Sequence, residues 1–238
     1  MTAVYWDWSF AWDSLPALLE GLWITVQLTL GGSVLALVIG LVLAMLRRTN
    51  VEPVRWLIGA IIEVLRGTPF LVQLFFVFYV LPKYGIQLPV LATGIIVLGL
   101  NYSAYTAECY RAGIEGVPQG QWEAARALNL STGRIWRAVI LPQAIPRVIP
   151  ALGNYVNQMF KDSAIVGAIG LFELLNTAKQ IGGLTYRFLE PLTMAAVLFL
   201  AISYLASIGV RRLERRMHSA ETAGADVNPP HLALGKPA

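Results

Sequence analysis

The chain has 238 residues, of which 56% are hydrophobic and only 13% are charged. The charged share is about half of that in ordinary soluble domains, and the mean hydropathy is +0.61, so a soluble globular protein is excluded. The formal net charge is only +4 and the sequence has no separate basic and aromatic face, which excludes nucleic acid as a partner.

The first 16 residues, MTAVYWDWSFAWDSLP, are rich in aromatic side chains. Trp and Tyr side chains favour the boundary between membrane and water. The segment also lacks the positively charged leader of a secretory signal peptide. We therefore expect residues 1–16 to form an interfacial segment on the periplasmic face.

Five later stretches are long and apolar enough to cross a membrane, because a spanning helix needs about 20 mainly apolar residues. They are residues 23–46, 56–82, 86–107, 143–165 and 191–210. The first, third and fifth stretches contain no charged residue. The sequence predicts an all-α integral membrane protein whose five transmembrane helices lie within residues 17–216.

Basic residues are distributed unevenly between the two sides of this arrangement. One side holds twelve of the 18 Lys and Arg residues: Arg47, Arg48, Arg55, Arg111, Arg126, Arg134, Arg137, Arg211, Arg212, Arg215, Arg216 and Lys236. Cytoplasmic loops carry an excess of Lys and Arg, so we expect the N-terminus outside and the C-terminus inside. Residues 217–238 are polar, which favours a disordered cytoplasmic tail.

The second stretch carries two opposite charges. Glu63 and Arg66 are three residues apart, so they can pair on one face of a helix. Charged groups inside a membrane are costly and usually face protein or water. We therefore expect Glu63 and Arg66 to form a gate or a structural ion pair.

A helix break is also expected in the second stretch. Pro69 follows Gly67 and Thr68 and should interrupt the helix, with Thr68 as a cap for the second half. A broken helix directs free N–H groups at a central cavity, where a substrate carboxylate could bind. The alternative is a kinked helix without such a role. On the first interpretation, Phe70 and Gln73 lie on the substrate path.

The third stretch carries polar residues on one helix face, since Asn101, Tyr105 and Glu108 follow a spacing of i, i+4, i+7. Glu108 lies near the cytoplasmic boundary, where it can pair with Arg111. Asn101 and Tyr102 lie deeper. We assign these two residues to the substrate path.

A polar segment of about residues 111–141 connects the third and fourth stretches, and QWEAARAL within it is a good helix former. Asn129 should end this helix, because Asn can replace Gly in the left-handed cap position. Ser131 or Thr132 can cap a second helix, and Pro142 marks the start of the next span. We expect a cytoplasmic pair of helices that offers a compact docking surface.

The fourth stretch has polar residues at positions i, i+3, i+4, i+7 and i+8. They are Asn154, Asn157, Gln158, Lys161 and Asp162. Such a stripe is the inverse of what lipid contact allows. We predict that the first three line the substrate path and that Lys161 and Asp162 form a gate or an ion pair. Polar packing between subunits is the alternative.

The segment EAARALNLSTGRIWRAVILP resembles the EAA signature of the membrane subunits of bacterial ABC importers. That signature reads E-A-A, three residues, Gly, nine residues, Ile, one residue, Leu-Pro. The matching residues are Glu123, Ala124, Ala125, Leu141 and Pro142. Asn129 replaces the usual Gly and Val139 replaces the usual Ile. Both replacements keep the physical character of the position.

Four further stretches resemble the polar amino-acid branch of these permeases: EVLRGTPFLVQLFF, AYTAECYRAGIEGVPQGQWEAA, LPQAIPRVIPALGN and KDSAI. The resemblance implies a type I ABC importer transmembrane domain over residues 17–216, embedded in the lipid of the bacterial inner membrane. It also implies a second permease subunit, identical or homologous, and a periplasmic solute-binding protein.

The resemblance further implies that the EAA helix docks on a cytoplasmic ABC ATPase dimer. The coupling residues would be Glu123, Ala124, Ala125, Leu128, Asn129, Leu141 and Pro142. The chain has no G-x-x-x-x-G-K-[ST] phosphate loop and no H-E-x-x-H or G-x-S-x-G motif. We therefore expect ATP and Mg to be bound by the partner, with no catalytic residue, metal site or cofactor in this chain.

Two other functions are weighed against an importer permease. An intramembrane enzyme would have to use Glu63, Lys161 or Asp162, but it lacks a nucleophile or metal constellation. A membrane scaffold or regulatory subunit would bind an ATPase without forming a solute path. ATP-dependent solute uptake into vesicles separates the scaffold from the permease.

The solute is expected to be a small polar zwitterion, either an amino acid or an ectoine-like compatible solute. QWEAARALNL, KDSAI and TYRFLEPLTM resemble the ectoine and hydroxyectoine permeases. Relatives that carry cationic amino acids can have acidic side chains near Phe70 and Tyr155, and both are aromatic here. Aromatic faces suit a delocalised cation, and Asn154 and Asn157 could hold the carboxylate.

Overall fold

The structure, a computed structural model, describes residues 5–225, with side chains described through residue 215. Every regular element in this range is helical, which confirms the all-α prediction. The α-helices are α1 (Trp8–Arg47), α2 (Glu52–Gly67), α3 (Phe70–Phe75), α4 (Val90–Glu115), α5 (Gln119–Ala127), α6 (Thr132–Arg134), α7 (Leu141–Asp162), α8 (Leu174–Thr185) and α9 (Leu189–Ala225). The π-helical turns η1 (Phe76–Val80) and η3 (Ile135–Ile140) and the 3-10 turns η2 (Leu81–Tyr84) and η4 (Ser163–Ile169) extend neighbouring helices.

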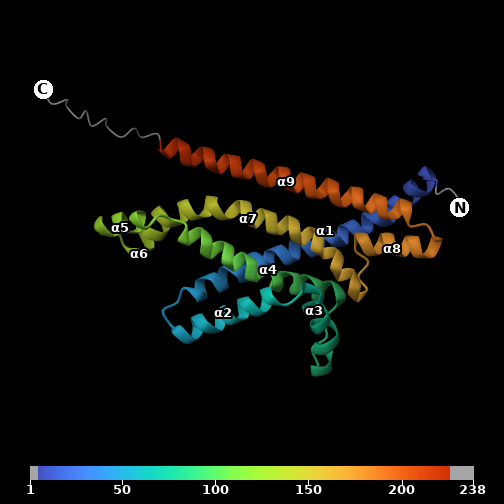
Figure 1. Ribbon diagram of the computed structural model, residues 1–238, viewed down its shortest axis with the longest axis horizontal. Helices are drawn as coiled ribbons and strands as arrows, with labels where there is room; N and C mark the ends of the chain where they lie inside the picture. Colours follow the sequence, from blue (N-terminus) through green and yellow to red (C-terminus); the bar gives the residue numbers. More distant parts are fainter. Residues whose placement is uncertain (1–4, 226–238) are drawn as a thin grey trace.

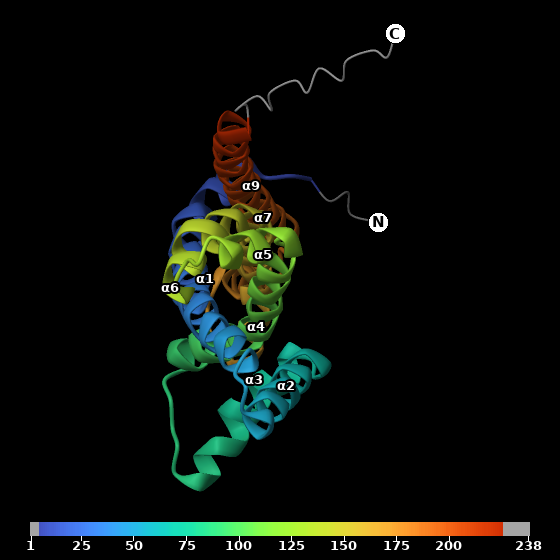
Figure 2. The same ribbon diagram turned by 90° about the vertical axis from the view of Figure 1, so that its left-hand side faces the viewer.

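Helices α1, α4, α7 and α9 run along the long axis of the molecule and pack against one another (Figure 1). Helices α2 and α3 project from one side of this group (Figure 2). Helices α5 and α6 lie at one end of the long axis, and α8 lies at the other end with the start of α1. Segments that the sequence assigns to opposite sides of a membrane therefore lie at opposite ends of the molecule.

Helices α1 and α4 form the most extensive helix pair, and small residues allow their close approach. A Cβ atom at Gly40 would overlap the Thr106 hydroxyl, and one at Gly99 would lie 2.6 Å from the Leu35 Cβ. The Thr106 hydroxyl donates a hydrogen bond of 2.7 Å to the Ala36 carbonyl. Small residues and interhelical hydrogen bonds are how helices associate in lipid, where the hydrophobic effect between them is absent.

Three helical segments within the described residues are long and apolar enough to cross a membrane. They are Trp8–Arg47, Val90–Glu115 and Leu189–Arg215, and the pair Glu52–Gly67 with Phe70–Tyr84, bent by 104°, makes a fourth if it counts as one span. The fourth expected span, residues 143–165, falls on α7 and the start of η4 and is not among them. The polar stripe of α7 lowers its hydropathy, so the five-helix count stays a prediction.

The second expected span is broken at Pro69, as predicted, and is not merely kinked. Helix α2 ends at Gly67 and α3 begins at Phe70. Thr68 closes α2, because its hydroxyl donates to the Val64 carbonyl at 2.8 Å. The expectation that Thr68 caps α3 is wrong, since α3 has no side-chain cap.

The two ends of the chain differ from the expected arrangement. The Asp7 carboxylate accepts from the Ser9 and Phe10 backbone N–H groups at 3.0 and 3.3 Å, so a capped helix begins at Trp8 and continues into the first span. Most of residues 1–16 are thus not a separate element. At the other end, α9 continues to Ala225, so it includes the first residues of the expected tail, and the disordered tail stays a prediction. Residues 226–238 lie outside the described residues.

An ionic cluster joins the start of α1 to the connection between α8 and α9. Arg187 contacts Asp7 at 3.1 Å and Glu190 at 2.6 Å, and its guanidinium lies 4.4 Å from the Phe10 ring centroid. Hydrogen bonds from the Ser9 hydroxyl, the Phe10 backbone and Arg187 lower the pKa of Asp7 to about 2. The Asp7 carboxylate therefore stays ionised, and available to Arg187, at every physiological pH.

Glu173, in the connection before α8, is fully buried although it is acidic. Its carboxylate caps α8 by accepting from the Leu175 and Asn176 backbone N–H groups at 2.8 and 2.7 Å. The neighbouring Leu174 N–H donates to the Thr25 hydroxyl of α1 at 3.1 Å. Burial dominates over these hydrogen bonds and raises the pKa of Glu173 from 4.5 to about 7.

This buried acid predicts that the folded protein is more stable in mild acid. The pKa of Glu173 rises from 4.5 in the unfolded chain to about 7 in the folded one, so its contribution is complete below 4.5 and is lost as the pH rises through about 7. The loss is on the order of 3 kcal/mol. We expect the thermal unfolding midpoint in detergent to fall between about pH 5 and pH 8, and Glu173→Gln to flatten this dependence. The exposed Glu20→Gln is the control; equal slopes in both variants contradict the prediction.

Candidate functional site

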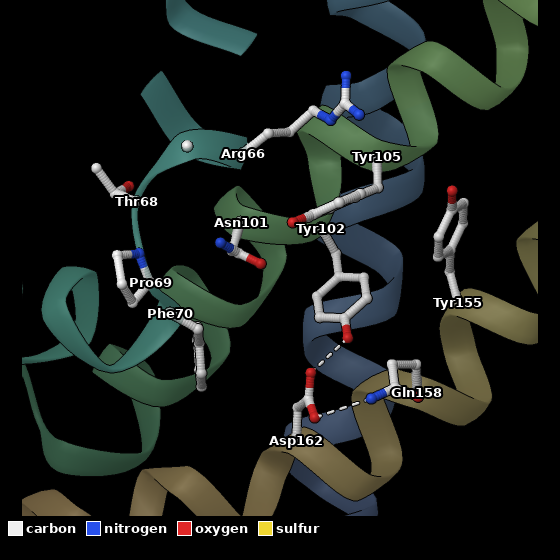
Figure 3. A pocket seen from close by; sticks show the side chains of 11 residues that line it. Arg66, Thr68, Pro69, Phe70, Asn101, Tyr102, Tyr105, Tyr155, Gln158 and Asp162 are labelled. Carbon is white, nitrogen blue, oxygen red and sulfur yellow. Dashed lines mark hydrogen bonds between the residues drawn. The ribbon is translucent and has the colours of Figure 1, made fainter. Parts of the chain in front are cut away.

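A cavity of about 500 Å³ lies where the break between α2 and α3 faces α4 and α7. The break contributes Arg66, Gly67, Thr68, Pro69 and Phe70, α4 contributes Asn101, Tyr102 and Tyr105, and α7 contributes Tyr155, Gln158 and Asp162. Figure 3 shows these side chains converging from three elements that are distant in sequence. Ligand cavities commonly have this size and this mixture of aromatic and polar groups.

One wall of the cavity is formed by three tyrosine rings. The ring centroids of Tyr102 and Tyr105 are 5.7 Å apart, and Tyr155 lies 6.3 Å from the first and 5.9 Å from the second. Tyr102 and Tyr105 are one turn apart on α4, and Tyr155 reaches them from α7. Tyr155 was predicted to lie on the path, whereas Tyr105 was noted only for its helix face and not assigned there.

Asp162 is the one acidic side chain that lines the cavity. Its carboxylate accepts a hydrogen bond of 2.6 Å from the Tyr102 hydroxyl and one of 3.1 Å from the Gln158 amide nitrogen. Two donors from different helices therefore orient the carboxylate, and α4 is tied to α7 at this point. Lys161, the neighbouring residue, is exposed and does not line the cavity.

Arg66 is the one basic side chain that lines the cavity. The expected pair of Glu63 and Arg66 does not form, because the Arg66 guanidinium turns to the Tyr105 ring, 5.6 Å from its centroid. Glu63 is exposed and does not line the cavity. Arg66 and Asp162 lie at opposite sides of the cavity with the aromatic rings between them (Figure 3).

Gln73 and Asn101 support the helix break beside the cavity. The Gln73 amide nitrogen donates to the Leu65 carbonyl at 2.8 Å and to the Thr68 hydroxyl at 2.7 Å. The Asn101 amide nitrogen donates to the same Leu65 carbonyl at 3.2 Å and to the Gln73 side-chain oxygen at 3.3 Å. Gln73 does not line the cavity, and Asn101 lines it with its donor group engaged.

The predicted polar stripe of α7 divides between two neighbours. Gln158 and Asp162 face the cavity, whereas the Asn157 amide donates to the Ser207 hydroxyl of α9 at 3.2 Å. Asn154 is exposed and does not line the cavity. The structure therefore brings neither of these two asparagines to the place where a solute carboxylate was expected.

The polar segment between α4 and α7 folds as a helix, a tight turn and a second helix. Asn129 has a φ of 53°, which confirms the left-handed end of α5. Ser131 stands at the N-cap position of α6 but makes no side-chain capping bond. The second helix is not separate from the next span, because α6 continues through η3 into α7, with Pro142 in the first turn of α7.

Helix α5 buries one face and exposes the other. Ala125 is buried in a cluster with Val117, Ile135 and Ile140. The Trp122 and Trp136 rings pack edge to face at 5.3 Å between their centroids, beside this cluster. The outward residues are Glu123, Ala124, Leu128 and Asn129, and Leu141 and Pro142 are exposed at the start of α7. Of the expected coupling residues, Ala125 is the one whose buried side chain attaches α5 to the rest of the molecule.

Glu108 ties this end of the molecule to α1. It pairs with Arg111 at 2.7 Å, as predicted, and it also pairs with Arg47 of α1. Arg111 in turn contacts Glu115 at 2.5 Å. These ion pairs fix α1 and α4 together where the chain leaves the apolar bundle.

The described helices form an apolar bundle beside a polar cavity, with a polar helical segment at one end, and this arrangement fits a membrane transport subunit. The chain belongs to the family of binding-protein-dependent transport system inner membrane components, which matches residues 32–219. It is therefore a multi-pass protein of the inner membrane.

Similar proteins are transport components and not enzymes. A probable amino-acid ABC transporter permease protein, y4tG, of Sinorhizobium fredii is 47% identical over 203 residues, covering 85% of this chain and 88% of the relative. The arginine transport system permease protein ArtQ of Bacillus subtilis is 34% identical over 214 residues, covering 90% and 98%. A solved amino acid ABC transporter with histidines superposes with a TM-score of 0.85 at 37% identity, covering 90% of this chain and 100% of that one. The predicted resemblance to amino-acid permeases is confirmed.

The hydrogen bonds at the helix break predict a specific loss of stability. Gln73→Leu and Asn101→Leu each remove a donor to the Leu65 carbonyl, and a buried polar group without its partner costs about 1–3 kcal/mol. We expect each variant to lower the thermal unfolding midpoint in detergent, and the double variant to lower it by more than the sum, because only the double variant leaves the Leu65 carbonyl without a side-chain donor. Gln87→Leu, in the exposed loop before α4, is the control. If either variant unfolds at the same temperature as Gln87→Leu, the amide that it removes does not stabilise the helix break.

Proposed function

We propose that two permease subunits of this kind form the membrane domain of an ATP-driven importer for a compact zwitterionic solute. The observation that carries the proposal is the placement of one cation and one anion, Arg66 and Asp162, at opposite sides of an aromatic cavity (Figure 3). The names of the relatives, which are amino-acid ABC transporter permeases, support an amino-acid-like solute.

The charges of the cavity favour a solute with one negative and one positive end. Arg66 presents several N–H donors for a carboxylate, and its cation is not engaged by Glu63. Asp162 offers the remaining lone pairs of its carboxylate to the positive end. A solute with a second positive charge would need a second acid in the cavity lining, which contains only Asp162. Arg66 thus takes the role that the sequence suggested for Asn154 and Asn157.

The aromatic lining further restricts the range of solutes that the cavity favours. Four rings, those of Phe70, Tyr102, Tyr105 and Tyr155, border the cavity, and aromatic faces attract delocalised or weakly hydrated cations. Ectoine combines such a cation with a carboxylate on one small ring. A neutral amino acid has the same pair of charges and is the second candidate.

The coupling part of the proposal concerns α5. We place α5 on the cytoplasmic side, with the N-terminus outside, because the basic residues gather at that end of the molecule. The exposed Glu123, Ala124 and Leu128 would enter a cleft of a partner ATPase that binds ATP and Mg. A periplasmic solute-binding protein would deliver the solute at the opposite end.

Reversing the charge of the exposed face of α5 tests this coupling. Glu123→Lys and Ala124→Asp should reduce uptake by the reconstituted transporter by about tenfold or more, since a mismatched charge in an interface costs several kcal/mol. The amount of permease in the membrane should not change, because both side chains are exposed. Glu52→Lys, an exposed acid at the start of α2, is the matched control. Normal uptake and normal solute-stimulated ATP hydrolysis in both α5 variants would exclude the coupling role.

Replacing the two cavity charges tests the solute site. Arg66→Gln and Asp162→Asn should each lower uptake of labelled ectoine or labelled glutamine by about tenfold to a hundredfold, because each removes a charge-assisted hydrogen bond. Glu63→Gln and Lys161→Gln are matched comparisons, since both residues are exposed and neither lines the cavity. Equal losses in all four variants would favour a gate of four charges over a binding site.

Competition identifies the solute on the same transporter. Excess ectoine or a neutral amino acid should block uptake, and arginine should not, because the cavity has a single acid. Block by arginine or histidine without any effect of ectoine and glutamine contradicts the zwitterion assignment. Absence of ATP-dependent uptake for every solute would favour the scaffold alternative.

A further inference from the structure

A second cavity, of about 520 Å³, lies far from the solute site, at the end of α1 that adjoins the α5–α6 segment. Leu41, Ala44 and Met45 of α1 form one wall, and Trp136 and Leu141 form the opposite wall. We call this cavity the α1 groove. Leu41, Met45 and Leu141 are exposed, so the groove opens outward from the bundle.

Two arginines are among the residues that line the α1 groove. Arg48 and Arg137 line it, and no acidic residue does. The Arg48 guanidinium lies 5.5 Å from the Trp136 ring centroid. Neither arginine has an ion pair within the part of the chain whose side chains are described, where Arg47 by contrast is paired with Glu108. Two positive charges therefore line one apolar groove, and no acidic side chain among the residues that line it neutralises them.

The depth of the groove relative to a membrane follows from α1. Residues 23–46 contain no charge, and Arg47 and Arg48 come directly after them. Leu41 and Met45 thus lie at the end of the hydrocarbon-spanning part, and Arg48 lies at the boundary with water. Trp136 fits the same boundary, which Trp side chains favour.

We propose that the α1 groove binds one anionic phospholipid, with an acyl chain against Leu41 and Met45 and the phosphate between Arg48 and Arg137. Basic pockets between membrane helices at the polar boundary hold anionic headgroups in this manner. The assignment to the cytoplasmic leaflet rests on the proposed topology, but the binding itself does not depend on the transport function.

Charge complementarity selects a lipid over the other occupants of such a groove. A second copy of the chain that met this face across a two-fold axis would bring its own Arg48 and Arg137 to the same place, which places like charges together. A soluble protein could supply an acid but not an acyl chain at membrane depth. An anionic phospholipid supplies both parts.

A bound lipid would bridge elements that otherwise touch little. One wall belongs to α1 and the other to Gly133, Trp136 and Arg137 of the segment that joins α5 to α7. The lipid would therefore hold the base of the coupling segment against the bundle.

The test is lipid binding to the purified full-length permease, measured by native mass spectrometry with phosphatidylglycerol and with phosphatidylcholine of the same acyl chains. Removal of both charges in the double variant Arg48→Gln, Arg137→Gln should weaken phosphatidylglycerol binding by about 30-fold, since each cation near an anionic lipid contributes about 1 kcal/mol. Phosphatidylcholine binding should not change. Arg55→Gln with Arg134→Gln is the matched control, because both arginines are exposed and outside the groove.

A second variant tests the groove without removing charge. Gly133 lines the groove, and a Cβ atom there meets nothing within 4 Å, so Gly133→Leu should fill the groove and weaken phosphatidylglycerol binding without disturbing the fold. Gly59→Leu, equally open on α2, is its control. Glycerol 3-phosphate should not displace the lipid.

Four outcomes overturn the proposal. They are equal affinity for the two lipids, unchanged phosphatidylglycerol binding in the double variant, unchanged binding in Gly133→Leu, and displacement by glycerol 3-phosphate at the lipid's own concentration. If Gly133→Leu separates paired permeases while lipid binding stays intact, the groove belongs to the subunit interface instead.

Discussion

A backbone carbonyl inside a membrane must find a donor, because no water is available there, and the structure around Pro69 depends on this constraint. The residue four places after Leu65 is Pro69, which has no N–H group, so the Leu65 carbonyl has no backbone donor within its helix. Gln73 and Asn101 donate to it from α3 and α4. These two amides thus satisfy the carbonyl that Pro69 leaves unpaired, beside the bend of 104° between α2 and α3.

The break in turn decides where the charges of the membrane region lie. It ends α2 one residue after Arg66, so the guanidinium reaches the cavity and the Tyr105 ring. Asp162 reaches the same cavity from α7 and is held by Tyr102. Both charged side chains thus line a cavity between protein elements, and charged groups at membrane depth usually face protein or a water-filled cavity. They remain apart, so a zwitterion can satisfy both.

Local signals in the sequence predicted local features of the fold. Pro69 breaks a helix, Asn129 takes the left-handed conformation, and Glu108 pairs with Arg111 one turn away. The EAA resemblance identified the family without any structure. These features depend on backbone sterics or on neighbours within one turn, which the order of residues fixes.

Features that depend on packing between distant elements could not be predicted in the same way. A helical period places Asn157 and Gln158 on one broad face, but it does not say which neighbour each meets; one meets α9 and the other the cavity. Spacing alone also favoured a pair of Glu63 with Arg66, whereas a ring from α4 attracts the arginine instead. The supporting role of Gln73 likewise depends on a carbonyl that only the folded break exposes.

The connection from the coupling segment to the cavity has a geometric consequence. The chain is continuously helical from Thr132 through η3 to Asp162, so it has no loop that could absorb a movement of α5. Ala125 anchors α5 to this helix through Ile135 and Ile140. A force on the exposed face of α5 therefore reaches Asp162 along one helix, while Tyr102 stays on α4, which is packed along α1. The hydrogen bond between Tyr102 and Asp162 joins this helix to α4, which is packed along α1. On the proposed coupling, a movement of α5 that shifts α7 relative to α4 would act on this contact.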